Sequence, residues 1–427
     1  MAKQTLTLVT AGNERSGKSS LLGHLLVKLN QVSPQQIYRN RRDSQAQDKK
    51  GKEYAWVLDS SETERFYNHT LEPSPTDLPI NNQLVTIYDA PGRSDLVPGF
   101  IQAANQADCM VLVVDSREKA FRRDWEGTDQ TKEHCFIGRG LGMTQAVVAV
   151  NKMEKGGWSE GRFVEIGETV GTYMRTIGFK EVVFVPVSAL LGTNLTELDS
   201  SLCPWYHGPT LVQALSSLQP LPREPHKPIR FTISDSLTQR HGTHLGNIIT
   251  GKVESGVISI KTKLFIVPSL VTCTVKQIVT GGEMVDRVVA GWIADISLGS
   301  MDGEVHKLAG GDVASGDSQT VSLARVFRVN GITFDLVQPI VKDQSVIIYI
   351  HNVKVAGHIR KLITLREGQT AKLRPRLIPK YKVATLEVEA EREIPMEKQG
   401  NIKALGRVVL RTEGKTVLCG AIAELLE

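Results

Sequence analysis

Hydrophobic residues follow two different patterns along this chain of 427 residues. Up to about residue 218, short continuous apolar runs alternate with longer stretches of helical character. Runs without polar interruption are typical of strands buried on both faces, as in a parallel sheet covered by helices. We therefore predict an α/β domain in the first half. Its strands are expected at residues 6–9, 84–88, 110–114, 146–150 and 182–187, and its helices include 19–29 and 162–177.

The pattern changes after a proline-dense segment at residues 219–228, which we interpret as a semi-stiff connector between domains. Beyond it, short β-rich runs are separated by glycine turns, as is typical of antiparallel barrels. The runs lie at 229–233, 272–278, 346–350, 359–365, 383–388 and 408–410. A split near 316–321 divides this half into two β-barrels. Three domains are thus expected, at 1–222, 223–318 and 319–427.

Composition narrows the class of protein. A hydrophobic content of 41% and a charged content of 23% are those of an ordinary globular chain, and no apolar run is long enough to cross a bilayer. The apolar stretch at residues 6–9 is too short for a signal peptide. Five scattered cysteines without a CxxC pair predict reduced thiols in the cytosol, not a disulfide framework or a zinc site. The charged segment 39–52 is expected to be a mobile surface loop.

The first candidate for chemistry is the pattern Gly12-x4-Gly17-Lys18-Ser19, between a predicted strand and a predicted helix. Glycines let backbone N–H groups close around phosphates, the lysine reaches their oxygens, and the hydroxyl of Ser19 ligates Mg²⁺. A glycine turn followed by a chance Lys-Ser is the alternative. The predicted phosphate-binding residues are Gly12, Asn13, Glu14, Arg15, Ser16, Gly17, Lys18, Ser19 and Ser20.

Asp89 and Gly92 form a second motif, Asp-x-x-Gly, directly after a predicted strand. The carboxylate is placed to bind Mg²⁺ through water, and the unhindered N–H of the glycine can sense a γ-phosphate. The same four residues would also make a good β-turn. The position at the carboxyl end of a buried strand, where α/β sheets bind ligands, favours the functional interpretation.

Two further motifs indicate a guanine base. Asn151 and Lys152 would support the base-binding loop, Glu154 would accept the N1 and N2 protons, and Ser188, Ala189 and Leu190 would offer a backbone donor. Each motif is weak alone, but the four occur in one fixed order. Together they predict a site for GTP or GDP with Mg²⁺.

With these motifs, the chain resembles translational GTPases of the elongation factor one alpha group. It is most similar to the ribosome-rescue GTPase that carries Pelota, and next to the class II release factor. Other segments extend this resemblance over nearly the whole chain. The segments that carry it begin at Tyr54-Ala55-Trp56, Gln130-Thr131-Lys132, Trp205-Tyr206, Gly251-Lys252-Val253 and Leu405-Gly406-Arg407. Leu141-Gly142-Met143 favours the rescue factor, whereas Cys203-Pro204 favours the release factor.

The resemblance implies a P-loop GTPase domain followed by two antiparallel β-barrels, with Ser19, Thr70 and Asp89 holding Mg²⁺. It also implies a cytoplasmic protein, monomeric when free, that acts with a Pelota-like protein or a class I release factor on the ribosome. Contact with ribosomal RNA is expected. The lysines and arginines of segment 372–382 either contact ribosomal RNA or Pelota, or form a solvated face. One alternative is translation termination. The other is a GTP-holding scaffold similar to the adaptor that joins the exosome to the superkiller complex.

This chain departs from the family at four places. Arg93 replaces the catalytic histidine that follows Gly92, and a guanidinium donates hydrogen bonds but cannot accept one from water. The segment before Thr70 reads Tyr67-Asn68-His69, Glu154 replaces an aspartate, and Asn13 and Arg15 replace a histidine and an aspartate. The chain is therefore expected to be a GTPase by resemblance, with a retained nucleotide site and slow or absent hydrolysis. His134 and His207 are expected to be surface or helix residues, because no Cys/His spacing accompanies them.

Overall fold

A computed structural model describes residues 5–80, 83–127, 130–241, 244–303, 305–316, 321–368 and 370–426. The chain divides into two compact units, Met1–Leu221 and Pro222–Glu427. The boundary expected at 318/319 lies outside the described residues.

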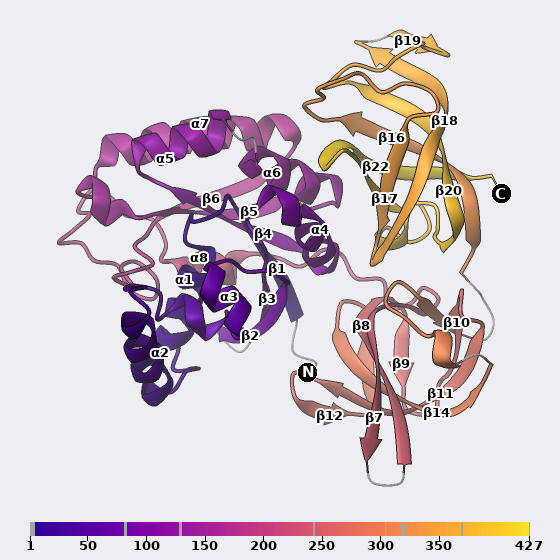
Figure 1. The fold of residues 1–427 in the computed structure, drawn as a ribbon, viewed down its shortest axis with the longest axis horizontal. Coiled ribbons are helices and arrows are strands. Elements are labelled where there is room, and N and C mark those ends of the chain that lie inside the picture. The colour runs from indigo at the N-terminus through magenta and orange to yellow at the C-terminus, as the bar shows by residue number, and fades with distance from the viewer. Residues whose placement is uncertain are drawn as a thin grey trace. The chain divides into compact units, whose positions relative to one another are not determined.

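The first unit is built on a six-stranded mixed sheet with the order β2-β3-β1-β4-β5-β6 (Figure 1). All neighbours pair in parallel except β2, which runs antiparallel to β3 at the edge. The five predicted strands are confirmed. The strand β2 was not predicted, because its prolines Pro75 and Pro79 break the apolar pattern and are tolerated at a sheet edge. The strands are β1 Thr5–Ala11, β2 Ser74–Ile80, β3 Gln83–Asp89, β4 Cys109–Asp115, β5 Gln145–Asn151 and β6 Glu181–Pro186.

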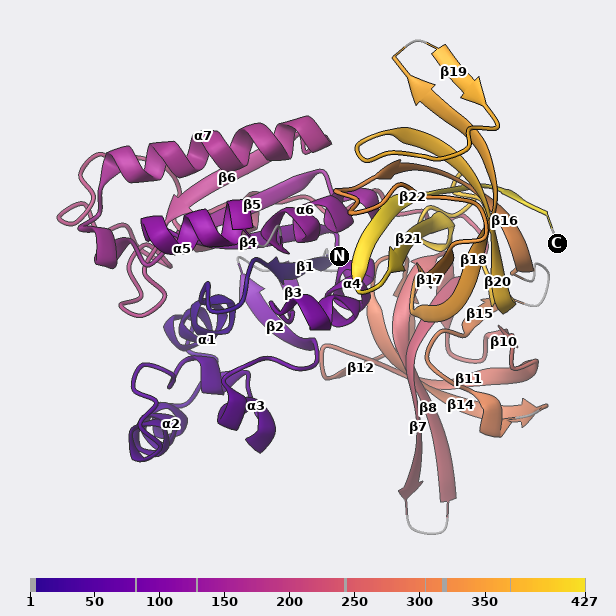
Figure 2. The same ribbon diagram turned by 45° about the horizontal axis from the view of Figure 1, so that its top comes forward.

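Helices cover both faces of this sheet (Figure 2). Leucines of α1 and α8 pack with Leu6 and Leu8 in one core cluster, whereas α4, α6 and α7 contact the sheet from the other face. The predicted helices 19–29 and 162–177 are confirmed as α1 and α7. The helices are α1 Lys18–Lys28, α2 Pro34–Ala46, α3 Glu62–Tyr67, α4 Val97–Gln106, α5 Glu118–Arg122, α6 Gln130–Gly140, α7 Glu160–Ile177 and α8 Leu211–Ser217, with short 3₁₀ turns η1 Ala55–Val57, η2 Ser94–Leu96 and η4 Met153–Gly156 and a π turn η3 Arg123–Gly127.

The mobile loop expected at residues 39–52 is wrong over most of its length, because α2 occupies residues up to Ala46. This helix has little apolar surface, so its composition concealed it. Its start is fixed by Ser33, whose hydroxyl accepts from the Gln36 N–H, and by Pro34 in the first turn. Asn40 is buried and donates to the Glu53 carbonyl at 3.3 Å, which ties the polar helix to the rest of the domain.

The first half of the second unit is a closed six-stranded antiparallel barrel, which we call barrel 1. The strands pair in the order β10-β15-β7-β8-β14-β11, and β10 pairs with β11 to close it. Its interior is one apolar cluster around Phe231 and Ile296. The strands of this region are β7 Arg230–His241, β8 His244–Ser255, β9 Val257–Ser259, β10 Lys263–Val267, β11 Val271–Thr280, β12 Glu283–Val285, β13 Arg287–Val289, β14 Ile293–Asp302 and β15 Val313–Gly316, with the 3₁₀ turn η5 Val305–Lys307.

A second closed barrel, barrel 2, follows with the order β17-β21-β22-β16-β20-β18, closed by β17 with β18. Its strands are β16 Leu323–Thr333, β17 Ser345–Ile350, β18 Val353–Glu367, β19 Thr370–Leu373, β20 Val383–Pro395, β21 Arg407–Thr412 and β22 Lys415–Leu425, with the 3₁₀ turn η6 Ala404–Gly406. All six β-rich runs predicted in the second half are confirmed as parts of strands. The predicted fold class, an α/β P-loop domain followed by two antiparallel barrels, is therefore confirmed.

Side chains join the two barrels within the second unit. Arg230 of barrel 1 forms a buried ion pair with Glu397 of barrel 2, and the Asn352 amide donates to the Ile233 carbonyl at 3.1 Å. Both charged side chains of the pair are less than 10% exposed. Because a buried charge is costly without its partner, separating the two barrels at this pair would be unfavourable.

All five cysteines are buried and unbridged. Burial raises the pKa of the Cys135 thiol to about 12 and that of Cys273 to about 11. None of the described helices is long and apolar enough to span a membrane.

Candidate nucleotide-binding site

The loop between β1 and α1 has the backbone that a phosphate cradle requires. Gly12 and Gly17 have φ values of 122° and 102°, in the left-handed region that disfavours other residues. A Cβ on Gly12 would lie 2.2 Å from the Val113 carbonyl oxygen, and one on Gly17 would lie 2.3 Å from the Asn151 Nδ2. Both glycines are therefore required by conformation and by space, and α1 begins with its free N–H groups at the loop.

Lys18 is buried at the centre of this loop. Its Nζ donates to the carbonyl oxygens of Gly12 and Asn13 at 3.1 and 3.0 Å. Burial lowers the pKa of this ammonium to about 8, although Asp89 and Glu14 act in the opposite direction. A bound phosphate would stabilise the charged ammonium in place of the water that burial has removed from around it, so the site favours an anion.

Oxygen atoms from four residues converge beside Lys18. Ser19 Oγ lies 3.0 Å from Thr70 Oγ1, which lies 3.3 Å from Asp59 Oδ1 and 3.5 Å from Asp89 Oδ2. Neighbouring ligands of an octahedral Mg²⁺ ion are roughly 2.9 Å apart, since each lies about 2.0–2.1 Å from the metal. The donor set of hard oxygens and its spacing therefore fit Mg²⁺, with Ser19 and Thr70 as candidate ligands and the carboxylates around them.

Asp59 was not among the predicted site residues. Burial, and after it the nearby Asp89 and Glu64 carboxylates, raise its pKa to about 7. A cation between Asp59 and Asp89 would relieve this repulsion. The signal that could have found Asp59 is its place eleven positions before Thr70, in the segment from Tyr54 already used for the resemblance.

The carboxylate of Asp89 is oriented by the strand next to it. Thr10 Oγ1 donates to Asp89 Oδ1 at 3.0 Å and accepts from the Ala90 N–H at 2.9 Å. Burial raises the pKa of Asp89, and hydrogen bonds from Ser19 and Thr10 lower it in part. The Asp-x-x-Gly loop is thus anchored at its first residue.

Gly92 lies against the phosphate loop. A Cβ there would meet Lys18 Nζ at 2.1 Å and the Glu14 backbone nitrogen at 2.9 Å, so only glycine fits. The next residue, Arg93, lines the same pocket but is held in a bidentate ion pair with Asp95, at 2.9 and 2.8 Å. The position at which the resemblance implies a catalytic histidine is therefore occupied by a guanidinium with a carboxylate partner of its own.

The side chain of His69 also lies at this pocket. His69 Nδ1 is 3.1 Å from Glu14 Oε1, a close contact whose angle falls short of a hydrogen bond. Both side chains line the pocket together with Gly92, Arg93 and Ser20. The γ-phosphate side of the site is thus polar and charged in this chain.

Asn151 connects the predicted base-binding loops to the phosphate loop. Its Nδ2 donates to the Ser16 carbonyl at 2.9 Å, and its Oδ1 accepts from the N–H groups of Ala189 at 2.9 Å and Lys152 at 2.8 Å. Lys152 Nζ donates to the Arg15 carbonyl at 2.6 Å. One amide therefore holds three predicted motifs in fixed relation.

Lys152 also pairs with Asp115 Oδ2 at 2.7 Å, a carboxylate that the sequence did not single out. Ser188 Oγ accepts from the Leu191 N–H at 3.1 Å and so shapes the loop that contains Ala189, whereas the Leu190 side chain is exposed. These contacts fix the backbone of the base-binding loops without using the side chain of Leu190.

Glu154 lies in η4, directly after Asn151 and Lys152. Its Oε2 is buried, and no hydrogen-bond donor reaches it from the part of the chain that the structure describes. A buried carboxylate oxygen without a donor is costly, and the N1–H and 2-amino groups of guanine are donors of the right kind.

His134 has a closer relation to the site than the sequence indicated. The sequence predicted a surface or helix residue. His134 does lie in helix α6, but it is fully buried. Its Nδ1 accepts from the Gly12 N–H at 3.2 Å, and its ring stacks on Phe100 at 4.0 Å. His134 therefore holds the backbone at the start of the phosphate loop. The two residues that make this hydrogen bond are 122 positions apart in the sequence.

Comparisons with known proteins agree with this geometry. The family described as "Elongation factor Tu GTP binding domain" matches residues 3–220, and "GTP-eEF1A C-terminal domain-like" matches 326–423. An "Elongation factor 1 alpha-like protein" of Schizosaccharomyces pombe is 32% identical over 99% of this chain and 70% of its own length. "Protein HBS1" of Drosophila melanogaster is 30% identical over 99% of this chain, which spans 63% of that protein.

Among solved structures, the GTP-bound GTPase-like domain of Ski7 from S. cerevisiae has a TM-score of 0.79, with 99% of this chain and 97% of that chain covered. At 18% identity, this likeness concerns the fold alone. The sequence matches decide the class: the chain belongs to the elongation factor Tu and elongation factor 1-alpha family of translational GTPases.

Proposed function

We propose that this chain binds GTP with Mg²⁺ and carries a Pelota-type partner to stalled ribosomes. The observation that carries the nucleotide half of the proposal is the junction at Asn151, whose amide joins the phosphate loop to the base-binding loops. Ser19, Thr70 and Asp89 would hold the metal, with Asp59 beside them. The Mg²⁺ ion would neutralise charge on the phosphates when bound.

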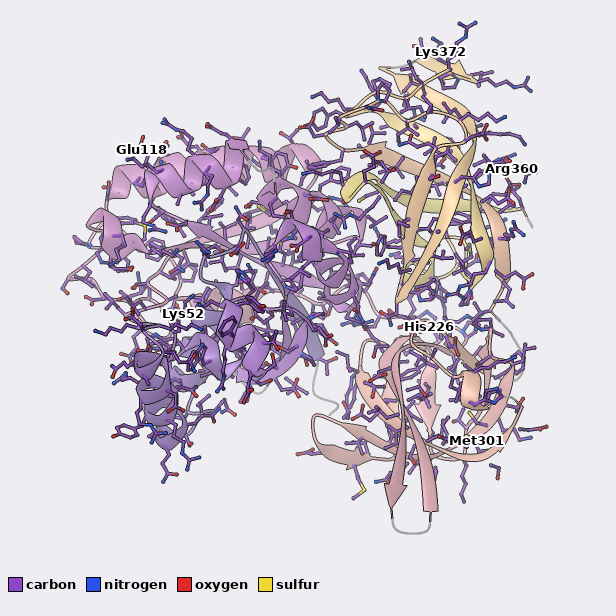
Figure 3. The ribbon with its side chains drawn as sticks, viewed as in Figure 1. Lys52, Glu118, His226, Met301, Arg360 and Lys372 are labelled. Atoms are coloured by element: carbon purple, nitrogen blue, oxygen red, sulfur yellow. The ribbon has the colours of Figure 1, made fainter. Side chains whose placement is uncertain are left out.

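Similarity to Protein HBS1 and the rescue-type segment that begins at Leu141 support the partner half. Barrel 2 also offers a groove rich in basic residues. It is lined by Arg328, Lys342, Lys361, Arg374 and Arg376, and by Glu387, which pairs with Arg328 and Lys361. Figure 3 labels two further basic residues of this barrel, Arg360 on β18 and Lys372 on β19. Such a surface suits a phosphate-bearing or acidic partner, including ribosomal RNA.

The partner can be identified by affinity purification. The tagged chain, loaded with a non-hydrolysable GTP analogue, would be incubated in parallel with purified Pelota and with the class I release factor. We expect retention of Pelota in the GTP-analogue state and much weaker retention in the GDP state. Exclusive retention of the release factor would replace rescue by termination, and retention of neither would remove the delivery role.

A GTP-holding scaffold is the second candidate, favoured by the ion pair of Arg93 with Asp95. Arg93 cannot accept a hydrogen bond from the attacking water, so we propose that hydrolysis is slow. Single-turnover hydrolysis of labelled GTP, with and without ribosomes, measures this directly. Turnover on ribosomes at the rate of a histidine-containing relative would contradict slow hydrolysis, and complete lack of turnover with tight GTP binding would favour the scaffold.

A further inference from the structure

His24 is a buried histidine of α1 that the site described above does not use. Its Nδ1 lies 2.7 Å from the Ala189 carbonyl oxygen, in the predicted base-binding loop. Its ring stacks on Tyr54, with centroids 3.7 Å apart and planes 5° from parallel. The imidazole therefore connects the helix after the phosphate loop, the segment that precedes η1 and the base-binding loop.

The direction of this hydrogen bond can be assigned. A carbonyl oxygen only accepts, so Nδ1 carries the proton and donates. Burial lowers the pKa of His24 below the usual histidine value, which favours the neutral ring. Space for the ring depends on Gly192, since a Cβ there would lie 2.6 Å from Cε1 and Nε2 of His24.

Holding the Ala189 carbonyl also fixes the next amide. In a trans peptide the C=O of one residue and the N–H of the next point in opposite directions. The Ala189–Leu190 bond is trans, so the Leu190 N–H points away from His24. The Ala189 N–H is already bonded to Asn151, whereas no acceptor for the Leu190 N–H exists within the described parts of the chain.

We propose that His24 is a positioning residue for purine recognition: by holding the Ala189 carbonyl, it aims the Leu190 N–H at the 6-keto oxygen of a guanine base. An adenine would present an amino donor at that position, and two donors cannot pair. The inference rests on the proposed binding of guanine nucleotides. It adds a determinant of base specificity that lies on α1, behind the loop.

Two variants separate the hydrogen bond from the ring. His24→Asn retains a donor at the place of Nδ1 but loses the ring, whereas His24→Phe retains the stack on Tyr54 but loses the donor. Affinities for GDP and for 2-aminopurine riboside diphosphate, which lacks the 6-keto oxygen, would be measured by displacement of a fluorescent GDP analogue from the full chain. Circular dichroism would check the fold of each variant.

We expect His24→Phe to lower the affinity for GDP about fivefold to tenfold, the effect of one neutral hydrogen bond. The affinity for the 2-aminopurine nucleotide should not change. His24→Asn should keep GDP affinity within about twofold of wild type. Equal weakening of both nucleotides by His24→Phe, or no change in either, would overturn the role of His24 while nucleotide binding stands. A wild-type chain that binds no fluorescent GDP would instead overturn the nucleotide site itself.

Discussion

Glu154 is one residue at which the chain's chemistry can be tested directly. Its buried Oε2 requires donors, and a guanine supplies two. Glu154→Gln removes the charge and should weaken GDP by about 10-fold to 150-fold, the effect of a charged hydrogen bond worth about 1.5–3 kcal/mol. Xanthine carries an oxygen in place of the 2-amino group, so the same substitution should raise the affinity for xanthosine diphosphate (XDP).

Titration calorimetry with GDP and XDP measures both effects. Glu168→Gln, an exposed carboxylate on α7, is the matched control and should change neither affinity. Equal loss for both nucleotides would mean that Glu154 supports the loop without reading the base.

Arg93 determines how fast we expect the bound GTP to be hydrolysed. Arg93→His restores a group that can both donate to and accept from water, so single-turnover hydrolysis on ribosomes should rise at least about tenfold. Arg93→Ala should leave the slow wild-type rate within about twofold. A sharp loss of rate in Arg93→Ala would show instead that the guanidinium stabilises the transition state, as an arginine finger does.

At the scale of elements, His351 gives barrel 2 a pH dependence. It follows β17, is buried and donates through Nε2 to the Pro395 carbonyl at 2.9 Å. Burial lowers its pKa from 6.5 to about 4. A histidine with a depressed folded pKa stabilises the fold above its unfolded pKa, and this contribution is lost as pH falls towards the folded pKa.

The free energy of unfolding of the full chain should therefore fall by about 2 kcal/mol between pH 7 and pH 5 through this residue. Urea denaturation of wild type and His351→Gln at both pH values isolates the contribution, since the variant cannot take up the proton. His226→Gln, in the exposed connector, is the control and should retain the wild-type pH dependence. An equal fall in the free energy of unfolding between pH 7 and pH 5 in wild type and His351→Gln would contradict the role of His351.

The elements that the sequence predicted are those with a local signal. The strands of the first unit, the phosphate loop and the Asp-x-x-Gly loop each have a pattern readable within ten residues. Helix α2 was missed because a polar helix is held by a cap and by Asn40, not by an apolar stripe. His24 and His134 were missed as site residues because their partners lie far away in the sequence, and only the fold brings them together. Asp59 lies only eleven positions before Thr70 and was overlooked within a segment used for the resemblance.

For the molecule as a whole, the buried pair of Arg230 with Glu397 should make the two barrels unfold as one body. Glu397→Ala removes the buried carboxylate that pairs with the Arg230 guanidinium and should lower the free energy of unfolding by about 3–5 kcal/mol. The double variant Arg230→Met, Glu397→Leu removes both charges and should recover most of it. Urea denaturation of the full chain measures these changes, and a loss below about 1 kcal/mol for Glu397→Ala would show that the pair contributes little.

The buried cysteines make it possible to follow local opening in each part of the molecule. Cys109, Cys135 and Cys203 lie in the first unit, Cys273 in barrel 1 and Cys419 in barrel 2, so each body contains its own thiol reporter. A maleimide reaches a buried thiol only when the surrounding structure opens. Timed alkylation read by peptide mass spectrometry would thus reveal, without any engineered probe, which body loosens first when nucleotide is withdrawn.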